Sequence, residues 1–188
     1  MRILILFFSL FLFACSSVPG KTFLLLQPPQ QASAIEITHP VKKLNVQLSE
    51  YLNRPALAIA NQQGEILFSE QYQWAERLDI ALADILQQRI NQQFLNRTSN
   101  QKYRLQVFIQ RFHSIKSSDP ELAANQMILK GEYLLFSDQG DLLEQAGFAL
   151  QQSQQIEDYQ DINLAMQDLI KQLAELISQQ IIELGKFK

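Results

Sequence analysis

The chain has few of the residues that most catalytic and metal sites require. Its 188 residues include one cysteine, two histidines and six glycines. A single cysteine forms no intramolecular disulfide, and the cysteine and histidine positions do not have the spacing of a zinc site. We interpret His39, in a proline-flanked segment, and His113, at the end of a predicted strand, as surface or turn residues. The sequence thus gives no positive indication of an enzyme, a metal site or a bound cofactor.

The chain also lacks an excess of positive charge and a long apolar run. Its formal net charge is −3, whereas proteins that bind nucleic acids are usually basic, so we expect no nucleic-acid partner. The longest apolar run, residues 3–13, has about eleven residues, and a membrane-spanning helix needs roughly 20. This run is therefore too short to be a stable membrane anchor by itself.

The first residues have the layout of a secretory signal peptide. Arg2 supplies a positive charge, the apolar run follows, and the small residue Ala14 precedes Cys15. The segment from Leu12 to Cys15 resembles the lipobox of bacterial lipoproteins, although Phe13 departs from the usual small or aliphatic residue. The resemblance implies removal of residues 1–14 and attachment of diacylglycerol and an N-acyl group to Cys15. Ser16 at the next position resembles an outer-membrane sorting signal, since Asp there is the familiar inner-membrane retention signal.

The remaining chain is predicted to form a short tether and a single domain. Residues 15–22 form the lipidated tether, and residues 23–188 form the domain. Fully extended, residues 16–22 reach roughly 25 Å, so the domain would lie close to its membrane. No internal repeat or second domain is evident.

Apolar periodicity predicts an α/β fold with α+β character. Alternation and turn residues predict strands over residues 23–26, 44–48, 57–60, 66–68, 103–109, 127–136 and 142–152. Apolar residues spaced three and four apart predict helices over residues 76–95 and 159–184. Residues 27–40 and 114–125 are expected to be loops. We predict one mixed sheet of about five to seven strands covered by two long amphipathic helices. The strand before the first helix and the strand after it are expected to lie parallel to each other in the sheet. The last three strands are expected to form an antiparallel meander.

Several short motifs resemble one protein family. Residues 51–55, Tyr-Leu-Asn-Arg-Pro, are similar to a Tyr-Leu-x-Arg-Pro element. Residues 74–78 are similar to the Trp-Ala-Glu-Pro-Leu that opens the family's first helix, although Arg77 stands at the proline position. Residues 105–112 match a Leu-x-Val-x-Ile-x-x-Phe strand. Their order and spacing, together with the lipobox, resemble the ABC-type transport auxiliary lipoproteins, which include paraquat-inducible protein C.

The motif residues have two interpretations. Scaffold roles are favoured, because a large aromatic before a helix can hold it against a sheet and proline fixes a backbone bend. Contact with a partner is the alternative. The candidate residues are Tyr51, Leu52, Arg54, Pro55, Trp74 and Glu76.

The resemblance implies a non-catalytic, outer-membrane role in lipid transport between membranes. The family's systems have an ATPase and a permease in the inner membrane and usually a periplasmic MCE protein that moves lipids. The lipoprotein would dock this MCE protein at the periplasmic face of the outer membrane. A ring of several copies would suit a cylindrical partner. The alternatives are an assembly factor or plug for an outer-membrane barrel, and a periplasmic lipid-binding carrier.

Overall fold

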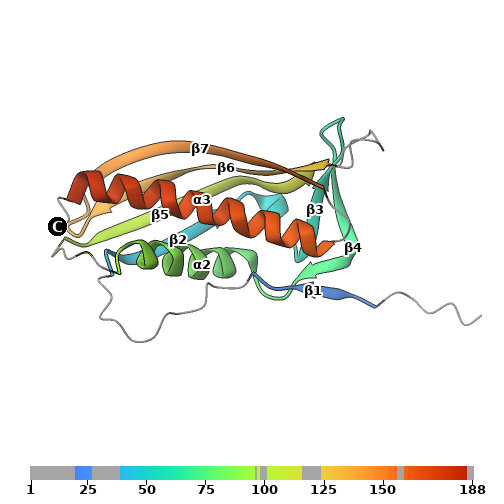
Figure 1. Ribbon diagram of the computed structural model, residues 1–188, viewed down its shortest axis with the longest axis horizontal. Coiled ribbons are helices and arrows are strands. Elements are labelled where there is room, and N and C mark those ends of the chain that lie inside the picture. The colour runs from blue at the N-terminus through green and yellow to red at the C-terminus, as the bar shows by residue number, and fades with distance from the viewer. Residues whose placement is uncertain are drawn as a thin grey trace, which may run out of the picture.

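The part of the chain that the structure describes forms one mixed seven-stranded sheet and two long helices (Figure 1), as the α+β prediction required. The computed structural model describes residues 20–26, 39–95, 97, 101–115, 124–155 and 159–185. The signal segment, Cys15 and most of the predicted loop at 27–40 lie outside these residues. The elements are β1 (Thr22–Leu24), β2 (Val41–Leu48), the 3₁₀ turn η2 (Glu50–Asn53), β3 (Ala56–Ala60), β4 (Ile66–Trp74), α2 (Leu78–Gln93), β5 (Tyr103–Ile115), β6 (Ala124–Ser137), β7 (Leu142–Gln155) and α3 (Tyr159–Gly185).

The three long strands β5, β6 and β7 form the predicted antiparallel meander. Alternating residues of β5, such as Leu105 and Val107, are buried against the helices. The turn between β6 and β7 contains Gly140, whose φ of 106° favours glycine. Ser137 Oγ accepts hydrogen bonds from the amides of Gly140 and Asp141 there, and thereby closes the turn.

The other edge of β5 carries two strands placed end to end. Strand β2 pairs in parallel with the first half of β5, and β3 pairs in parallel with its last two residues. The turn η2 lies between β2 and β3, and β4 pairs with β3 on one side and with β1 on the other. The predicted parallel pairing of the two strands joined by the first helix is wrong. The hairpin from β3 to β4 reverses the chain, so β3 rather than β4 lies parallel to β5.

Both helices lie side by side against one face of the sheet (Figure 1), where α2 covers β2 and α3 covers β6 and β7. The apolar stripe of α3, from Ile162 to Ile181, is buried as predicted, but Leu184 at its end is exposed. Neither helix of the described chain is apolar enough over a sufficient length to cross a membrane.

Several strands are longer than their sequence patterns predict. Strand β4 continues to Trp74, β5 to Ile115, and β6 begins at Ala124. The predicted loop at 114–125 is therefore wrong at both ends, and residues 116–123 lie outside the described chain. Helix α2 begins at Leu78, two residues after its predicted start at Glu76.

Candidate functional site

Two of the three motifs, residues 51–55 and 74–78, meet where β2 ends and α2 begins. The Trp74 amide donates a hydrogen bond of 2.7 Å to the Pro55 carbonyl oxygen, which joins the motif at 51–55 to the motif at 74–78. A groove of about 500 Å³ opens at this junction. It is lined by Leu48, Asn53, Arg54, Pro55, Trp74, Ala75, Glu76, Arg77, Leu78 and Asp79. Four of the six predicted candidate residues thus lie in one groove.

The floor of this motif groove is held by aromatic packing. Trp74 is only 6% exposed, and its ring stacks on Phe112 of β5 with 6.1 Å between centroids and 18° between planes. A stacked aromatic pair adds to the free energy gained from burial. Trp74 therefore fixes the end of β4 against the core immediately before α2 begins.

Tyr51 and Leu52, which lie outside the lining of the groove, attach η2 to the sheet. Leu52 is buried in the core. The Tyr51 hydroxyl lies 3.0 Å from His113 Nδ1 and accepts a 3.4 Å hydrogen bond from the Phe112 amide. With its proton on Nε2, the neutral imidazole can accept a hydrogen bond from the Tyr51 hydroxyl at Nδ1. This contact holds η2 beside β5 at the point where β2 gives way to β3.

The prediction that His113 is a surface or turn residue is wrong, because its side chain is only 5% exposed. Burial lowers the pKa of His113, and the positive charge of Arg111 lowers it further. Burial also raises the pKa of Tyr51, so both partners favour their neutral forms. His39, by contrast, is exposed, as predicted.

The rim of the motif groove carries accessible charges. Arg54, Pro55 and Glu76 are exposed. The Arg54 guanidinium carbon lies 4.6 Å from the centroid of the Phe68 ring, a cation–π contact that orients the side chain. Within the described chain, neither Arg54 nor Glu76 forms an ion pair. Their charges are therefore available to an interacting molecule.

A neighbouring ion pair lies at the start of α2. Arg77 and Asp79 lie 2.7 Å apart at the groove wall. Hydrogen bonding to Arg77 lowers the pKa of the Asp79 carboxyl. The Asp79 carboxylate in the first helical turn also faces the positive end of the helix dipole. Among the described residues, Arg77 and Asp79 are thus paired with each other, whereas Arg54 and Glu76 of the groove form no ion pair.

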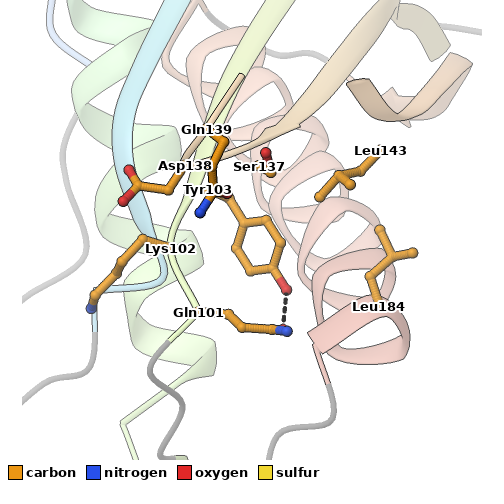
Figure 2. A pocket seen from close by; sticks show the side chains of 8 residues that line it. All are labelled: Gln101, Lys102, Tyr103, Ser137, Asp138, Gln139, Leu143 and Leu184. Atoms are coloured by element: carbon orange, nitrogen blue, oxygen red, sulfur yellow. Dashed lines mark hydrogen bonds between the residues drawn. The ribbon is translucent and has the colours of Figure 1, made fainter. Parts of the chain in front are cut away.

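A second pocket, of about 400 Å³, lies at the end of the sheet where β5 begins and β6 ends. Figure 2 shows its lining, in which Tyr103, Leu143 and Leu184 surround an opening bordered by polar side chains. The Tyr103 hydroxyl donates a 2.8 Å hydrogen bond to Gln101 Oε1. This pocket was not predicted from the sequence, because its lining residues come from distant segments and the turn at 138–141 was the only local feature among them.

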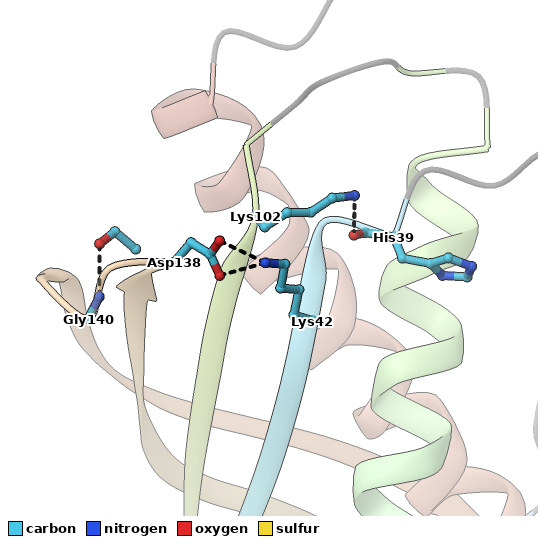
Figure 3. Close-up of polar contacts among 6 residues, drawn as sticks. His39, Lys42, Lys102, Asp138 and Gly140 are labelled. Carbon is cyan, nitrogen blue, oxygen red and sulfur yellow. Dashed lines mark hydrogen bonds and ion pairs between the residues drawn. The ribbon is translucent and has the colours of Figure 1, made fainter.

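Polar groups near this second pocket already have structural partners. Figure 3 shows Lys42 Nζ bound to both Asp138 carboxylate oxygens, at 2.8 and 2.7 Å, and Lys102 Nζ donating to the His39 carbonyl at 3.0 Å. No group of three or more metal-binding side chains occurs in the part of the chain that the structure describes. Asp138 and Lys102, which line the second pocket, are thus held by contacts within the domain.

The strand that follows the predicted tether lies beside the motif groove. The Ala75 amide, in the groove lining, donates a 2.8 Å hydrogen bond to the Leu24 carbonyl of β1. On the other side of β1, Asn163 Nδ2 of α3 donates to the Leu25 carbonyl at 3.2 Å. Ala14 and Cys15 lie outside the described residues, but β1 fixes where the chain leading to them meets the domain.

Comparison with solved structures shows a shared fold. A crystal structure of an uncharacterised protein superposes with a TM-score of 0.68 at 18% identity, covering 86% of this chain and 99% of the other. A crystal structure from Xanthomonas campestris, protein XCC0632 of the DUF330 family, gives a TM-score of 0.61 at 14% identity, covering 87% and 94%.

Comparison at the level of sequence identifies the family. A search of curated proteins found no match. Residues 23–178 match the family described as the ABC-type transport auxiliary lipoprotein component. This range includes all three motifs, the motif groove, all of the sheet except Thr22, and most of α3. The chain therefore belongs to the ABC-type transport auxiliary lipoprotein component family.

Proposed function

We propose that this protein is a non-catalytic docking component of an ABC-type lipid transport system, anchored to the outer membrane through acylated Cys15. The observation that carries this proposal is the motif groove, which lies against β1 and has at its rim Arg54 and Glu76, both without an ion pair among the described residues. An exposed pair of opposite charges suits recognition of another protein, because complementary charges set orientation and partner choice.

The partner we propose is the periplasmic MCE protein of the same system. A lipid anchor would confine the domain to the membrane plane, and such confinement raises the effective concentration of a tethered binding site. Because β1 contacts Ala75 in the groove lining, a partner bound in the groove would be held close to the anchored end of the chain. The lipoprotein would thus position the end of the lipid conduit at the outer-membrane leaflet, and a ring of copies would extend this contact around a cylindrical partner.

Charge reversal in the groove tests this proposal. The variants Arg54→Glu and Glu76→Lys change exposed side chains and are expected to leave the fold intact. Central interface residues often contribute 2 kcal/mol or more, so capture of the MCE protein from solubilised membranes should fall by about tenfold or more for a contact of that strength. Lys171→Glu, on the exposed side of α3, is the matched control and should capture the partner normally.

The identity of the captured protein separates the alternatives. Recovery of an outer-membrane barrel in place of an MCE protein would favour an assembly factor or plug, and bound lipid in the purified domain would favour a carrier. Equal capture by the groove variants and the control would contradict docking through this groove.

A further inference from the structure

Strand β1 leaves two large apolar side chains in solvent. Phe23 is 62% exposed and Leu25 is 47% exposed, whereas Leu24 and Leu26, which alternate with them, are buried in the core. The strand thus has one face in the core and one apolar face without a described partner. Exposed apolar patches of this kind commonly mark contacts with a protein or a membrane.

A third apolar residue lies on the adjoining part of α3. Leu164 is 56% exposed and is next in sequence to Asn163, whose side chain donates a hydrogen bond to the Leu25 carbonyl. Figure 1 shows β1 and the start of α3 at one end of the molecule and the C-terminal end of α3 at the other. We name Phe23, Leu25 and Leu164 the β1 patch.

The β1 patch is fixed to the body of the domain. Strand β1 pairs with β4 in register Phe23 to Gln73 and Leu24 to Trp74. The hydrogen bonds from Ala75 and from Asn163 hold successive carbonyls of the segment from opposite sides. A surface that touched the patch would therefore set the orientation of the whole domain.

We infer that the β1 patch inserts into the interfacial region of the phospholipid leaflet that carries the Cys15 lipid. This inference rests on the lipid anchor of the proposed function. The eight Cα-to-Cα steps from Cys15 to Phe23 span at most roughly 28 Å, so the anchor holds the patch near the leaflet. An apolar surface confined beside a bilayer gains free energy by burial at the headgroup boundary. Exposed Lys21, which precedes β1, adds a positive charge that suits anionic headgroups.

This contact gives the domain a defined orientation. Because the Leu24 carbonyl binds the Ala75 amide, the motif groove would lie close to the leaflet. The second pocket, lined by Leu143 and Leu184, would lie at the end of the molecule remote from the membrane. A partner bound in the motif groove would then release or receive lipid beside the membrane surface.

Site-specific labelling tests the inference on the full acylated protein in vesicles of phosphatidylethanolamine and phosphatidylglycerol. Acylation occupies the only native thiol, so Leu164→Cys and Phe23→Cys each introduce one reactive cysteine for an environment-sensitive fluorophore. Leu142→Cys is the matched control, because Leu142 is 52% exposed on β7 and near the remote end. Emission from labels at positions 23 and 164 should shift to the blue and be quenched by nitroxide lipids, and emission from position 142 should not.

The outcomes separate this inference from the lipid anchor. Intact mass spectrometry of the same sample reports the acyl groups on Cys15. Acylated protein with water-like emission at both patch positions would overturn the membrane contact but not the anchor. A blue shift that nitroxide lipids leave unquenched would also overturn the membrane contact, because it would show that a second copy of the protein covers the patch. Protein without acyl groups would overturn the anchor and this inference together.

Discussion

Gly131 lies on β6 beside the irregularity in β5, where no larger residue fits. A Cβ atom at this position would clash with the Phe108 carbonyl oxygen and stand 2.8 Å from the Phe148 ring. The first obstacle is backbone, which cannot rotate away. Gly131→Ala should therefore lower the free energy of unfolding by about 2–4 kcal/mol, as measured by urea denaturation.

Gly147 on β7 supplies the control for this substitution. A Cβ atom there would meet only the Gly131 carbonyl oxygen, at 3.7 Å, which is an ordinary contact. Gly147→Ala should change stability by less than about 1 kcal/mol. Equal effects of the two substitutions would contradict the close packing at Gly131.

The buried His113 makes stability depend on pH. Because burial lowers its pKa in the fold, the unfolded chain binds the proton more readily. The stability that neutral, buried His113 contributes is therefore fully present above pH 6.5, the ordinary pKa of a histidine side chain. It is lost as the pH falls through the lower pKa that His113 has in the folded state. Urea unfolding at about pH 7.5 and about pH 5.5 should show lower stability at the acidic value.

Replacement of His113 identifies the residue responsible for this loss. His113→Gln keeps an acceptor for the Tyr51 hydroxyl but cannot titrate, so the difference between the two pH values should shrink. His39→Gln changes an exposed histidine and should leave the difference in place. If His39→Gln reduced the stability difference between the two pH values more than His113→Gln did, His113 would not be the residue that controls this difference.

The burial of His113 could not be predicted from the residues around it in the sequence. Its partner Tyr51 is 62 positions away, and no local pattern reports such a contact. The alternation of buried and exposed residues in β5 is also interrupted, because the register shifts between Ile109 and Arg111. Local alternation therefore does not predict the second half of β5, and His113 falls at the end of the predicted strand.

At the scale of elements, Trp74 links β4, β5 and the start of α2. Trp74→Ala would leave a cavity beside Phe112 and should cost about 3–5 kcal/mol of stability. Trp74→Phe retains an aromatic ring and should cost less. Arg54→Ala, on the exposed rim, should stay within about 1 kcal/mol of the native protein. A Trp74→Ala variant as stable as Arg54→Ala in thermal or urea unfolding would contradict this role.

Periodicity predicts most elements, because each amphipathic strand and helix carries its own burial pattern. The meander of β5 to β7 and the long stripe of α3 are examples. The placement of β2 and β3 end to end along β5 is not predictable from local patterns, since it depends on pairing between distant segments. For the same reason, only the family resemblance connects the motif at 51–55 with the motif at 74–78 in the sequence. Their contact in space is shown by the hydrogen bond from the Trp74 amide to the Pro55 carbonyl oxygen.

At the scale of the whole molecule, the acyl groups on Cys15 and the residue at position 16 are expected to decide where the protein resides. Cys15→Ala should abolish acylation and leave an unprocessed or mislocalised protein in cell fractionation. Ser16→Asp should keep the acyl groups but shift the protein toward the inner membrane. Ser17→Asp, one position further from the sorting residue, is the control and is expected to shift the protein less. Unchanged sedimentation of Cys15→Ala with outer membranes would contradict the anchoring role.

Intact mass spectrometry of the mature protein from native membranes is the decisive test of the lipid anchor. We expect a chain that begins at Cys15 and carries the added mass of diacylglycerol and an N-acyl group. A mature chain whose first residue carries no acyl mass would contradict the proposal that this sheet-and-helix domain works as a lipid-anchored docking component.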